Sequence, residues 1–276
     1  MIMVGVYGLI GEKLGHSHSP QIHDLILKHM GLNGTYNLFQ VKKENLKFAI
    51  NGLKALNVKG VNVTIPYKVD IIRYLDEISN EAGNIGAVNT IDFNQGILKG
   101  YNTDYYGFGA TLKNFNVPVK GEKAVILGTG GASKAVRQYL IDNGIKEIIY
   151  VSRNKEKKLG DFRVIEYSEI KDVTDSRVLI NCTPCGMYPN IKECPIKKEE
   201  IKNFSYVVDL IYNPEETLLL RYAKEEGLVA VNGLYMLVSQ AVKAQEIWQK
   251  RKLSLEDEYR IYEEIRKTLL GARNHE

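Results

Sequence analysis

The sequence predicts an α/β protein built from two α/β domains. Three observations lead to this prediction: the length, the order of the elements and one glycine-rich turn. With 276 residues, the chain exceeds the ~100–200 residues of a usual single core. Strand-like and helix-like segments alternate along it, which favours parallel strands joined by helical crossovers. The turn Gly128-Thr129-Gly130-Gly131 lies directly between a strand and a helix, as in a doubly wound sheet.

The first block of elements ends near residue 104. Apolar patterning predicts strands at 4–10, 35–41 and 60–65, and helices at 19–31, at 44–57 and over YKVDIIRYLDEI, which Pro66 opens. The helix at 19–31 carries clear boundary signals, since Ser19 can cap it, Pro20 suits the first helical position and Gly31 ends it. We expect these elements to form a domain of residues 1–104 with a mostly parallel sheet.

The second block has the repeated strand–helix order of a Rossmann-type domain. Its predicted strands are 123–128, 146–153, 163–167, 177–183, 206–212 and 228–233, and its predicted helices are 129–144 and 217–227. Two long helices, at about 234–250 and 254–270, end the chain. We expect residues 105–233 to form the second domain and residues 234–276 to return to the first.

Composition and charge exclude several classes of protein. The net charge of +4 comes from 37 basic and 33 acidic residues that are scattered along the chain, which does not indicate nucleic-acid binding. No stretch approaches the ~18 apolar residues of a membrane span, and the first residues lack the pattern of a secretory signal. We expect a cytoplasmic enzyme with small anionic ligands, acting as a monomer or a homodimer, with no nucleic-acid or membrane partner.

The cysteines and histidines do not form a recognisable metal or redox motif. Cys182-Thr-Pro-Cys185 has C-x-x-C spacing, but no second pair and no thioredoxin-like context accompany it. His16 and His18 could chelate an ion, yet no carboxylate or cysteine nearby would complete a ligand set. We therefore expect structural thiols and no metal.

The glycine-rich turn has the features of a dinucleotide site. Gly128 permits a tight turn, while Gly130 and Gly131 let backbone N–H groups approach a pyrophosphate at the start of a helix. Ala132 and Ser133 are small enough for close packing of this helix on the sheet.

The end of the next strand favours NADP over NAD. An NAD site usually has Asp or Glu there to hold the ribose 2′-hydroxyl, whereas this strand ends Val151-Ser152-Arg153-Asn154-Lys155. Arg153 can stack on adenine or bind a 2′-phosphate. Ser152, Asn154 and Lys155 can donate hydrogen bonds to that phosphate, and Lys157 and Lys158 add positive charge.

Polar residues in the first block indicate a substrate site. Alternation over 61–65 places Asn62 and Thr64 on one face of a strand, opposite three aliphatic side chains. Ser17 and Ser19, just before a helix start, could hold a carboxylate together with the N–H groups of that helix.

Two charged residues of this block carry possible catalytic roles. Lys68 falls in the first turn of the helix expected after Pro66, where the helix dipole disfavours a cation, so another interaction or plain surface exposure must explain it. Asp104 follows Asn102-Thr103, and its carboxylate could belong to the site or could simply cap the next helix.

Taken together, these motifs resemble the shikimate dehydrogenase family. The matching segments run in order from residue 4 to about 248: GHSHSPQIH (15–23), NVTIPYK (62–68), GAVNT (86–90), NTD (102–104), GTGGA (128–132), NCTP (181–184), DLIYNP (209–214) and GLYMLVSQ (233–240). Two departures from the family pattern occur. Ser152-Arg153-Asn154 replaces the usual Asn-Arg-Thr, and Cys182 and Cys185 replace residues that are more often small or aliphatic.

The resemblance implies reduction of 3-dehydroshikimate to shikimate with NADPH, and roles for particular positions. Ser17 and Ser19 match carboxylate-binding positions, and Lys68 with Asp104 matches the catalytic pair. Positions that bind ring hydroxyls or line the substrate pocket match Asn62, Thr64, Asn89, Asp104, Tyr212 and Gln240. Cofactor positions match Gly128, Thr129, Gly130, Gly131, Ala132, Ser152, Arg153, Asn154, Lys155 and Thr183, with Leu210, Gly233 and Met236 on the nicotinamide side.

Two versions of the mechanism and several other functions stay open at this point. The Lys68 ammonium can donate a proton to the developing alkoxide, and Asp104 would stabilise that charged form, which helps reduction but hinders the reverse oxidation. Lys68 is thus either a proton shuttle or a fixed electrostatic orienter. The alternatives are a quinate/shikimate dehydrogenase with relaxed substrate or NAD use, a non-catalytic dinucleotide-binding regulator, and a thiol redox protein.

Overall fold

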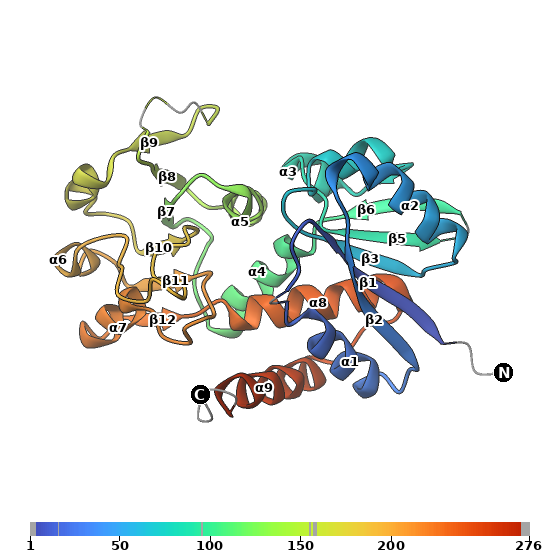
Figure 1. Ribbon diagram of the computed structural model, residues 1–276. Helices are drawn as coiled ribbons and strands as arrows, with labels where there is room; N and C mark the ends of the chain where they lie inside the picture. Colours follow the sequence, from blue (N-terminus) through green and yellow to red (C-terminus); the bar gives the residue numbers. More distant parts are fainter. Residues whose placement is uncertain (1–3, 16, 95, 155, 157–158, 272–276) are drawn as a thin grey trace. The chain divides into compact units, whose positions relative to one another are not determined.

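The computed structural model describes residues 4–15, 17–94, 96–154, 156 and 159–271 (Figure 1). The chain divides into two compact units. The first unit consists of Met1–Gly107 and Val238–Glu276, and the second unit is Phe108–Leu237. The second unit is therefore one continuous segment inserted into the first.

A mixed sheet forms the centre of the first unit. Its strands are β1 (Gly5–Gly11), β2 (Gly34–Gln40), β3 (Gly60–Val63), β4 (Glu77–Ile78), β5 (Thr90–Asn94) and β6 (Ile97–Tyr101), in the order β2-β1-β3-β5-β6-β4. Of the five pairings among the described strands, β1 with β2, β1 with β3 and β4 with β6 are parallel, and the other two are antiparallel. The antiparallel pairs come from the β5–β6 hairpin, which the sequence pattern did not reveal.

Helices cover both faces of this sheet (Figure 1). The first unit contains α1 (Ser19–His29), α2 (Leu46–Ala55), α3 (Asn80–Ile85), α9 (Leu255–Gly271) and parts of α4 (Thr103–Asn114) and α8 (Leu234–Gln249), with 3-10 turns η1 (Lys43–Asn45) and η2 (Asp70–Tyr74). One core cluster joins α2, η2 and α3 to the sheet. The other joins α1 and α8 to it, with Trp248 of α8 packed among Tyr7, Leu27 and Tyr36.

The prediction of a helix after Pro66 is wrong. The segment forms turns, then η2, then the short strand β4. The reason is tertiary: the Lys68 carbonyl accepts a hydrogen bond from the Val88 N–H at 2.7 Å instead of from a residue one helical turn further on. Lys68 consequently lies in a turn and not in the first turn of the expected helix. The strand expected over 60–65 is shorter than predicted, since β3 ends at Val63, and Ile65 is 77% exposed.

The start of α1 also differs from the expectation. Ser19 is the first helical residue and His18 holds the capping position, without a capping hydrogen bond from its side chain. Ser17 makes the local contact, because its Oγ accepts from the Ser19 N–H at 3.2 Å. Pro20 does occupy the first turn, and Gly31 follows the helix with a φ of +65°, as expected for those residues.

The second unit is a doubly wound sheet of parallel strands. The strands described there are β7 (Lys123–Leu127), β8 (Glu147–Val151), β9 (Arg163–Ile165), β10 (Val178–Asn181), β11 (Tyr206–Asp209) and β12 (Val229–Val231), in the order β12-β11-β10-β7-β8-β9. Every pairing among them is parallel. The chain starts at β7, runs outward through β8 and β9, and returns to β10 on the other side of β7. The strand order therefore reverses between β7 and β10, where ligands of such sheets bind.

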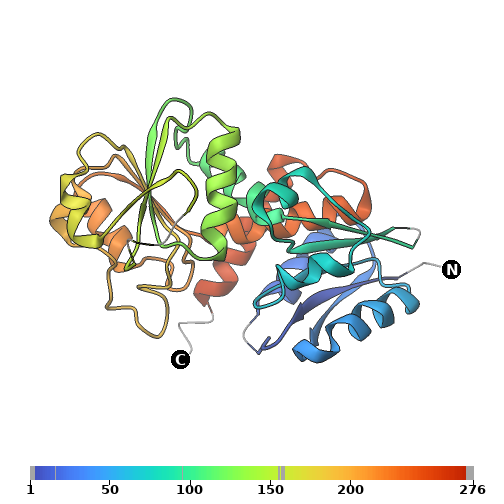
Figure 2. The same cartoon turned by 90° about the horizontal axis from the view of Figure 1, so that it is seen from above.

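Helix α5 (Gly131–Asp142) covers one face of this sheet, and α6 (Lys198–Ile201) with α7 (Leu218–Glu225) covers the other (Figure 2). The 3-10 turn η3 (Tyr167–Asp172) joins the core of α6 and α7 through Ile170. This architecture confirms the Rossmann-type fold expected from the glycine-rich turn.

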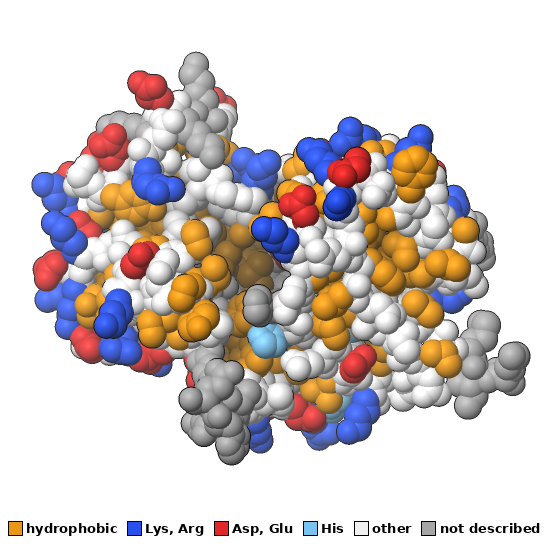
Figure 3. All heavy atoms as spheres, in the orientation of Figure 1, with side chains coloured by type: hydrophobic (Ala, Val, Ile, Leu, Met, Phe, Trp, Pro, Cys, Tyr) orange, Lys and Arg blue, Asp and Glu red, His pale blue; other side chains and the backbone are white. Residues whose placement is uncertain are grey.

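Two surface properties complete the fold. None of the helices in the described residues is both long and apolar enough to cross a bilayer. On the face drawn in Figure 3, acidic and basic side chains are interspersed over each unit, as on an ordinary solvated surface.

Candidate active site

The first unit brings Lys68 and Asp104 into direct contact. Lys68 Nζ donates to Asp104 Oδ2 at 2.6 Å, and the two side chains are 29% and 18% exposed. Asp104 lies in the first turn of α4, where the N–H groups of the helix favour a carboxylate. Asn102, whose Oδ1 lies 3.4 Å from the Tyr105 N–H, makes the local contact that was considered for Asp104. The interaction that Lys68 requires is therefore this ion pair.

Asn89 holds the second oxygen of the Asp104 carboxylate. Its Nδ2 donates to Asp104 Oδ1 at 2.9 Å. Its own Oδ1 accepts from the Thr103 N–H at 2.6 Å, from Thr90 Oγ1 at 3.1 Å and from Thr103 Oγ1 at 3.2 Å. These donors fix which end of the buried Asn89 amide faces Asp104, and hence fix the orientation of the carboxylate towards Lys68.

Asn62 is built into the same set of hydrogen bonds. It faces Thr90 across the antiparallel β3–β5 pair and donates from Nδ2 to Thr90 Oγ1 at 2.9 Å and to the Asn89 carbonyl at 3.3 Å. Its Oδ1 accepts from the Tyr36 hydroxyl at 2.8 Å. Both N–H groups of the buried Asn62 side chain are thus engaged within the protein, and its Oδ1 accepts from Tyr36.

The remaining residues predicted in this unit adjoin the same cluster. Burial raises the pKa of the Tyr36 hydroxyl, and an interaction with the Ser19 side chain opposes that rise, so Ser19 lies near Tyr36. Ser17 Oγ accepts from the Ser19 N–H at 3.2 Å. Gln240 of α8 accepts from Thr103 Oγ1 at 3.3 Å through its Oε1. Thr64 is half-buried directly after β3 and is anchored by its N–H to the Ile10 carbonyl at 2.9 Å.

Tyr36 and His23 support this cluster and were not predicted as site residues. The imidazole of His23 stacks on the Tyr36 ring at 4.0 Å, and its Nδ1 lies 3.0 Å from Gln245 Nε2. Burial lowers the pKa of His23 to about 3, so the ring is neutral at physiological pH. Strand periodicity marks Tyr36 as buried but carries no information about the partner of its hydroxyl.

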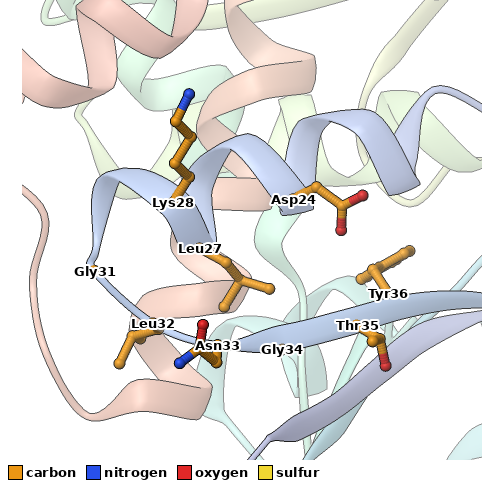
Figure 4. Close-up of a pocket in the computed structure, with 9 residues that line it drawn as sticks. All are labelled: Asp24, Leu27, Lys28, Gly31, Leu32, Asn33, Gly34, Thr35 and Tyr36. Carbon is orange, nitrogen blue, oxygen red and sulfur yellow. The ribbon is translucent and has the colours of Figure 1, made fainter.

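A separate cavity of about 520 Å³ lies between α1 and β2 (Figure 4). Its lining residues are Asp24, Leu27, Lys28, Gly31, Leu32, Asn33, Gly34, Thr35 and Tyr36. Tyr36 alone is shared with the hydrogen-bonded cluster, and none of the predicted substrate residues lines it. Among the described residues, no group of three or more His, Cys, Asp or Glu side chains is placed to hold a metal ion, and His16 lies outside those residues.

The glycine-rich turn of the second unit fits a pyrophosphate. Gly128 has a φ of +90°, and a Cβ there would lie 2.7 Å from Thr183 Cγ2. Gly130 caps α5 and Gly131 begins it, and a Cβ on either residue would meet nothing within 4 Å. Both glycines thus leave open space in front of the helix N-terminus, where N–H groups bind phosphate. Thr129 lies within this turn.

The residues that follow this turn behave differently from one another. Ser133 is buried and its Oγ donates to the Gly130 carbonyl at 2.7 Å, which fixes the turn. The packing role expected for Ala132 is wrong, because Ala132 is exposed on the outer side of the first helical turn.

The end of β8 presents polar and basic groups and no carboxylate from 151 to 154. Ser152 is buried and its Oγ accepts from the Asn154 N–H at 3.1 Å. Arg153 and Asn154 are exposed. Their guanidinium and amide donors fit a phosphate on an adenosine ribose. Lys155, Lys157 and Lys158 lie outside the described residues.

The predicted nicotinamide-side residues gather at the ends of β10 and β11. Thr183 follows β10, whose Asn181 pairs with Leu127 of β7, and this register brings Thr183 to Gly128. A Cβ on Gly233 would lie 2.1 Å from the Leu210 carbonyl oxygen, so these two backbones are in contact. Met236 is 9% exposed in the first turn of α8. Tyr212 is half-buried in the loop after β11, in the second unit rather than with the other predicted substrate residues.

Comparison with known proteins identifies the family. The model of the shikimate dehydrogenase substrate binding domain matches residues 9–91. A shikimate dehydrogenase (NADP(+)) of Clostridium perfringens is 48% identical over 266 residues, which cover 95% of this chain and 98% of that protein. The chain belongs to the shikimate dehydrogenase family. This membership confirms the resemblance seen in the sequence motifs.

Solved structures of shikimate dehydrogenases have the same fold along nearly the whole chain. A chorismate mutase/shikimate 5-dehydrogenase fusion protein from Clostridium acetobutylicum is 50% identical, with a TM-score of 0.94 and coverage of 98% of this chain and 99% of that chain. Shikimate 5-dehydrogenase from Thermus thermophilus, in complex with NADP(H) and shikimate, is 31% identical with a TM-score of 0.85, covering 95% and 99%.

The two cysteines that depart from the shikimate dehydrogenase pattern, and Cys194, lie in surroundings that raise the pKa of their thiols. Cys182, Cys185 and Cys194 are free thiols. Burial raises the pKa of Cys182 and of Cys185 above the ordinary value, and that of Cys194 to about 11. Since the thiolate is the reactive form, these raised pKa values argue against the thiol redox hypothesis.

Proposed function

We propose that the chain is an NADP-dependent shikimate dehydrogenase that reversibly reduces 3-dehydroshikimate to shikimate. The observation that carries this proposal is the Lys68–Asp104 ion pair at 2.6 Å, held by Asn89, in a member of this family. A non-catalytic regulator would have no need for an oriented, partly buried cation. A small acid with ring hydroxyls matches the surrounding hydroxyl and amide groups.

The proposed substrate residues divide by the groups they offer. The hydroxyls of Ser17 and Ser19, with the N–H groups at the start of α1, would bind the carboxylate. Ring hydroxyls would be bound by Thr64, Asn89, Gln240 and Asp104. Tyr212 stays a substrate-side residue expected from the resemblance. Asn62 has both N–H groups engaged within the protein, so its contribution is an acceptor oxygen and the fixed position of Thr90.

The second unit would hold NADP, whose reduced form NADPH would supply the hydride for reduction and whose oxidised form would accept it in the reverse direction. Gly128, Thr129, Gly130, Gly131 and Ala132 would bind the pyrophosphate with backbone N–H groups. The 2′-phosphate would be bound by Ser152, Arg153, Asn154 and Lys155. Thr183, Leu210, Gly233 and Met236 would surround the nicotinamide. The open space at Gly130 and Gly131 and the absence of a carboxylate from 151 to 154 support this assignment.

The protein's part in the reaction is to supply a proton and to stabilise charge. As the substrate carbon accepts hydride, its carbonyl oxygen becomes an alkoxide. Lys68 Nζ would donate a hydrogen bond and then a proton to that oxygen. Asp104 would hold Nζ in position and stabilise the ammonium form, while Asn89 fixes the carboxylate. In the reverse direction the same nitrogen would accept the proton of the hydroxyl group.

The first experiment is to follow absorbance of reduced nicotinamide with shikimate or quinate and with NADP or NAD, in all four pairings. We expect fast turnover with shikimate and NADP. Both pairings with NAD should have at least ten-fold lower kcat/KM, because charged hydrogen bonds to a 2′-phosphate are lost with NAD. Quinate with NADP should also react more slowly, because the paired Ser17 and Ser19 suit the flatter ring of shikimate, which lacks the extra hydroxyl of quinate. Comparable rates with quinate or NAD would instead favour the relaxed quinate/shikimate dehydrogenase. No turnover in any pairing would contradict the proposed function.

Arg153 tests the cofactor assignment. We expect Arg153→Ser to raise the KM for NADP about 10- to 100-fold, since charged hydrogen bonds to phosphate contribute ~1.5–3 kcal/mol, and to leave the KM for shikimate unchanged. The matched control is Arg177→Ser. Arg177 directly precedes β10, at the amino ends of the parallel strands and not at their carboxyl ends, and pairs with Glu122 at 3.0 Å. An equal loss of NADP affinity in both variants would contradict the role of Arg153.

The oligomeric state, monomer or homodimer, and action in the cytoplasm stay predictions from the sequence.

A further inference from the structure

Asp209 is a fully buried carboxylate at the end of β11, with 0% of its surface exposed. Its Oδ1 accepts from Asn181 Nδ2 at 3.0 Å and from the Ile211 N–H at 3.1 Å, and its Oδ2 accepts from Thr217 Oγ1 at 2.7 Å. Within the described residues, the partners of this carboxylate are Thr217, Ile211 and Asn181, and no Lys or Arg is among them. A buried carboxylate held by neutral donors is costly, so its presence requires an explanation.

Two of these three donors lead directly to residues of the proposed cofactor site. Asn181 uses its other side-chain atom, Oδ1, to accept from the Thr183 N–H at 3.0 Å and from Thr183 Oγ1 at 2.7 Å. The Asp209 carboxylate thereby orients the Asn181 amide, and that amide orients Thr183, which lies against Gly128.

Ile211 carries the second connection. Its N–H donates to Asp209, and its carbonyl accepts from the Gly233 N–H at 3.0 Å. Leu210, which lies between Asp209 and Ile211 in the sequence, is in backbone contact with Gly233. One carboxylate thus ties together the loop after β10, the loop after β11 and the residue that precedes α8.

We propose that Asp209 is a positioning residue for the nicotinamide half of NADP, holding Thr183 through Asn181 and holding Leu210 and Gly233 through Ile211. The inference rests on the proposed function. It concerns a residue that touches other protein groups, so its effect on NADP is indirect and passes through these hydrogen bonds.

The electrostatics of Asp209 make its role separable from a purely structural one. Burial raises its pKa to about 6, although the bonds from Thr217, Ile211 and Asn181 oppose that rise. The titratable groups that face it are the thiols of Cys182, Cys185 and Cys194, whose own raised pKa values keep them neutral at physiological pH. The folded-state pKa of Asp209 exceeds its ordinary value of 3.8. The stability penalty is therefore absent below pH 3.8, grows as pH rises to about 6, and is complete above it.

A group that costs stability at working pH while it organises a ligand site is the expected trade between stability and function. Replacement of Asp209 by a neutral residue of the same shape should thus stabilise the protein and weaken its hold on the cofactor. If Asp209 had a purely structural role, its replacement would not raise stability and weaken NADP binding at the same time.

The test is Asp209→Asn. Its oxygen can still accept from Asn181 and Ile211, and its new amide can donate to Thr217 Oγ1, so the fold is retained. We expect a higher Tm than the wild type at pH 7.5, with the gain shrinking towards pH 4. We expect the Kd for NADP at pH 7.5 to rise about five-fold or more, because neutral hydrogen bonds orient Asn181 less strongly than charged ones. The Kd for shikimate should stay within two-fold.

The pH dependence adds a readout that a structural defect would not reproduce. Between pH 7.5 and 5 the wild type should lose NADP affinity by a larger factor than Asp209→Asn, which already lacks the charge. The 2′-phosphate of NADP also titrates near pH ~6, but equally in both proteins, so their ratio isolates Asp209. Asp175→Asn is the control for charge removal, since Asp175 is exposed and pairs with Lys123 in the same unit.

Each outcome is decisive. A lower Tm for Asp209→Asn at pH 7.5, or an unchanged Kd for NADP, would overturn the inference and leave the proposed function standing. Failure of the wild type itself to bind NADP would overturn the proposed function and the inference with it.

Discussion

Lys68→Met is expected to lower kcat for shikimate oxidation by about 10²- to 10⁴-fold, the range that a positioned proton donor or acceptor contributes. Methionine keeps the length and the apolar stem of lysine but removes the donor that lies 2.6 Å from Asp104. The KM for shikimate should change much less, because the carboxylate and ring hydroxyls have other partners. Steady-state kinetics in both directions, with Kd for shikimate measured separately, provides the measurement.

The same variant separates the two versions of the mechanism. A variant that keeps most of its kcat would exclude the proton shuttle and leave Lys68 as an electrostatic orienter. Lys99→Met is the matched control, since Lys99 belongs to the same unit and pairs with Glu77 at 2.9 Å on the surface. The control should retain the kcat of the wild type. A similar loss in both variants would indicate a general effect of removing a lysine.

Gly233→Ala is expected to destabilise the second unit by roughly 3 kcal/mol and to abolish measurable NADP binding. The new Cβ would lie 2.1 Å from the Leu210 carbonyl oxygen and 2.5 Å from its carbon, so backbone atoms must move. Overpacking of this kind costs ~1–3 kcal/mol or more even where side chains can give way, and a main-chain carbonyl yields less readily. Thermal unfolding and NADP titration of the purified variant check both parts.

At Gly52 we expect the opposite effect on stability from the same glycine-to-alanine substitution. Gly52 lies in the interior of α2, and a Cβ there would meet nothing within 4 Å. Gly52→Ala should therefore raise stability by ~0.5–1 kcal/mol, because alanine loses less conformational freedom in a helix. Unaltered stability in Gly233→Ala alongside this gain would show that the contact with Leu210 relaxes easily.

The second unit could be predicted closely because local signals determine it. Each of its strands is a short apolar run, and the Gly128–Gly131 turn combines steric and hydrogen-bonding needs that few other residues meet. The parallel order around β7 then follows from the rule that crossovers are short and right-handed. The exposure of Ala132 could not be read in this way, since it depends on which side of α5 faces the sheet.

The first unit was predicted less completely because long-range pairs determine it. The segment after Pro66 has a helical pattern. The helix does not form, because the Lys68 carbonyl accepts a hydrogen bond from the Val88 N–H. The β5–β6 hairpin and the register of Asn62 against Thr90 have no local signature. Tyr36 could not be placed in the site for the same reason, since its hydroxyl meets Asn62 from a strand 26 residues away.

The candidate site shows the same division. The pattern marked Lys68 as unusual but left Asp104 as an ordinary cap candidate, and only the resemblance to a family joined the two as a pair across 36 residues. The glycine-rich turn could be predicted as a dinucleotide site from its own residues, without the resemblance to a family. Asp209 was part of a quoted motif, yet its burial and its tie to Thr183 require the neighbouring ends of β10 and β11, which exist only in the folded sheet.

The insertion of the second unit into the first has a consequence for synthesis on the ribosome. All residues from Phe108 to Leu237 follow one another, so the second unit can complete its core as soon as its last strand and the start of α8 emerge. The packing of Tyr7 and His23 is complete only after Trp248 has been synthesised, because Trp248 stacks on the two rings at centroid distances of 5.1 and 5.5 Å. At ~5–20 residues per second, this delay is on the order of tens of seconds. The first 107 residues are thus made first, yet the core that they share with α8 is completed last.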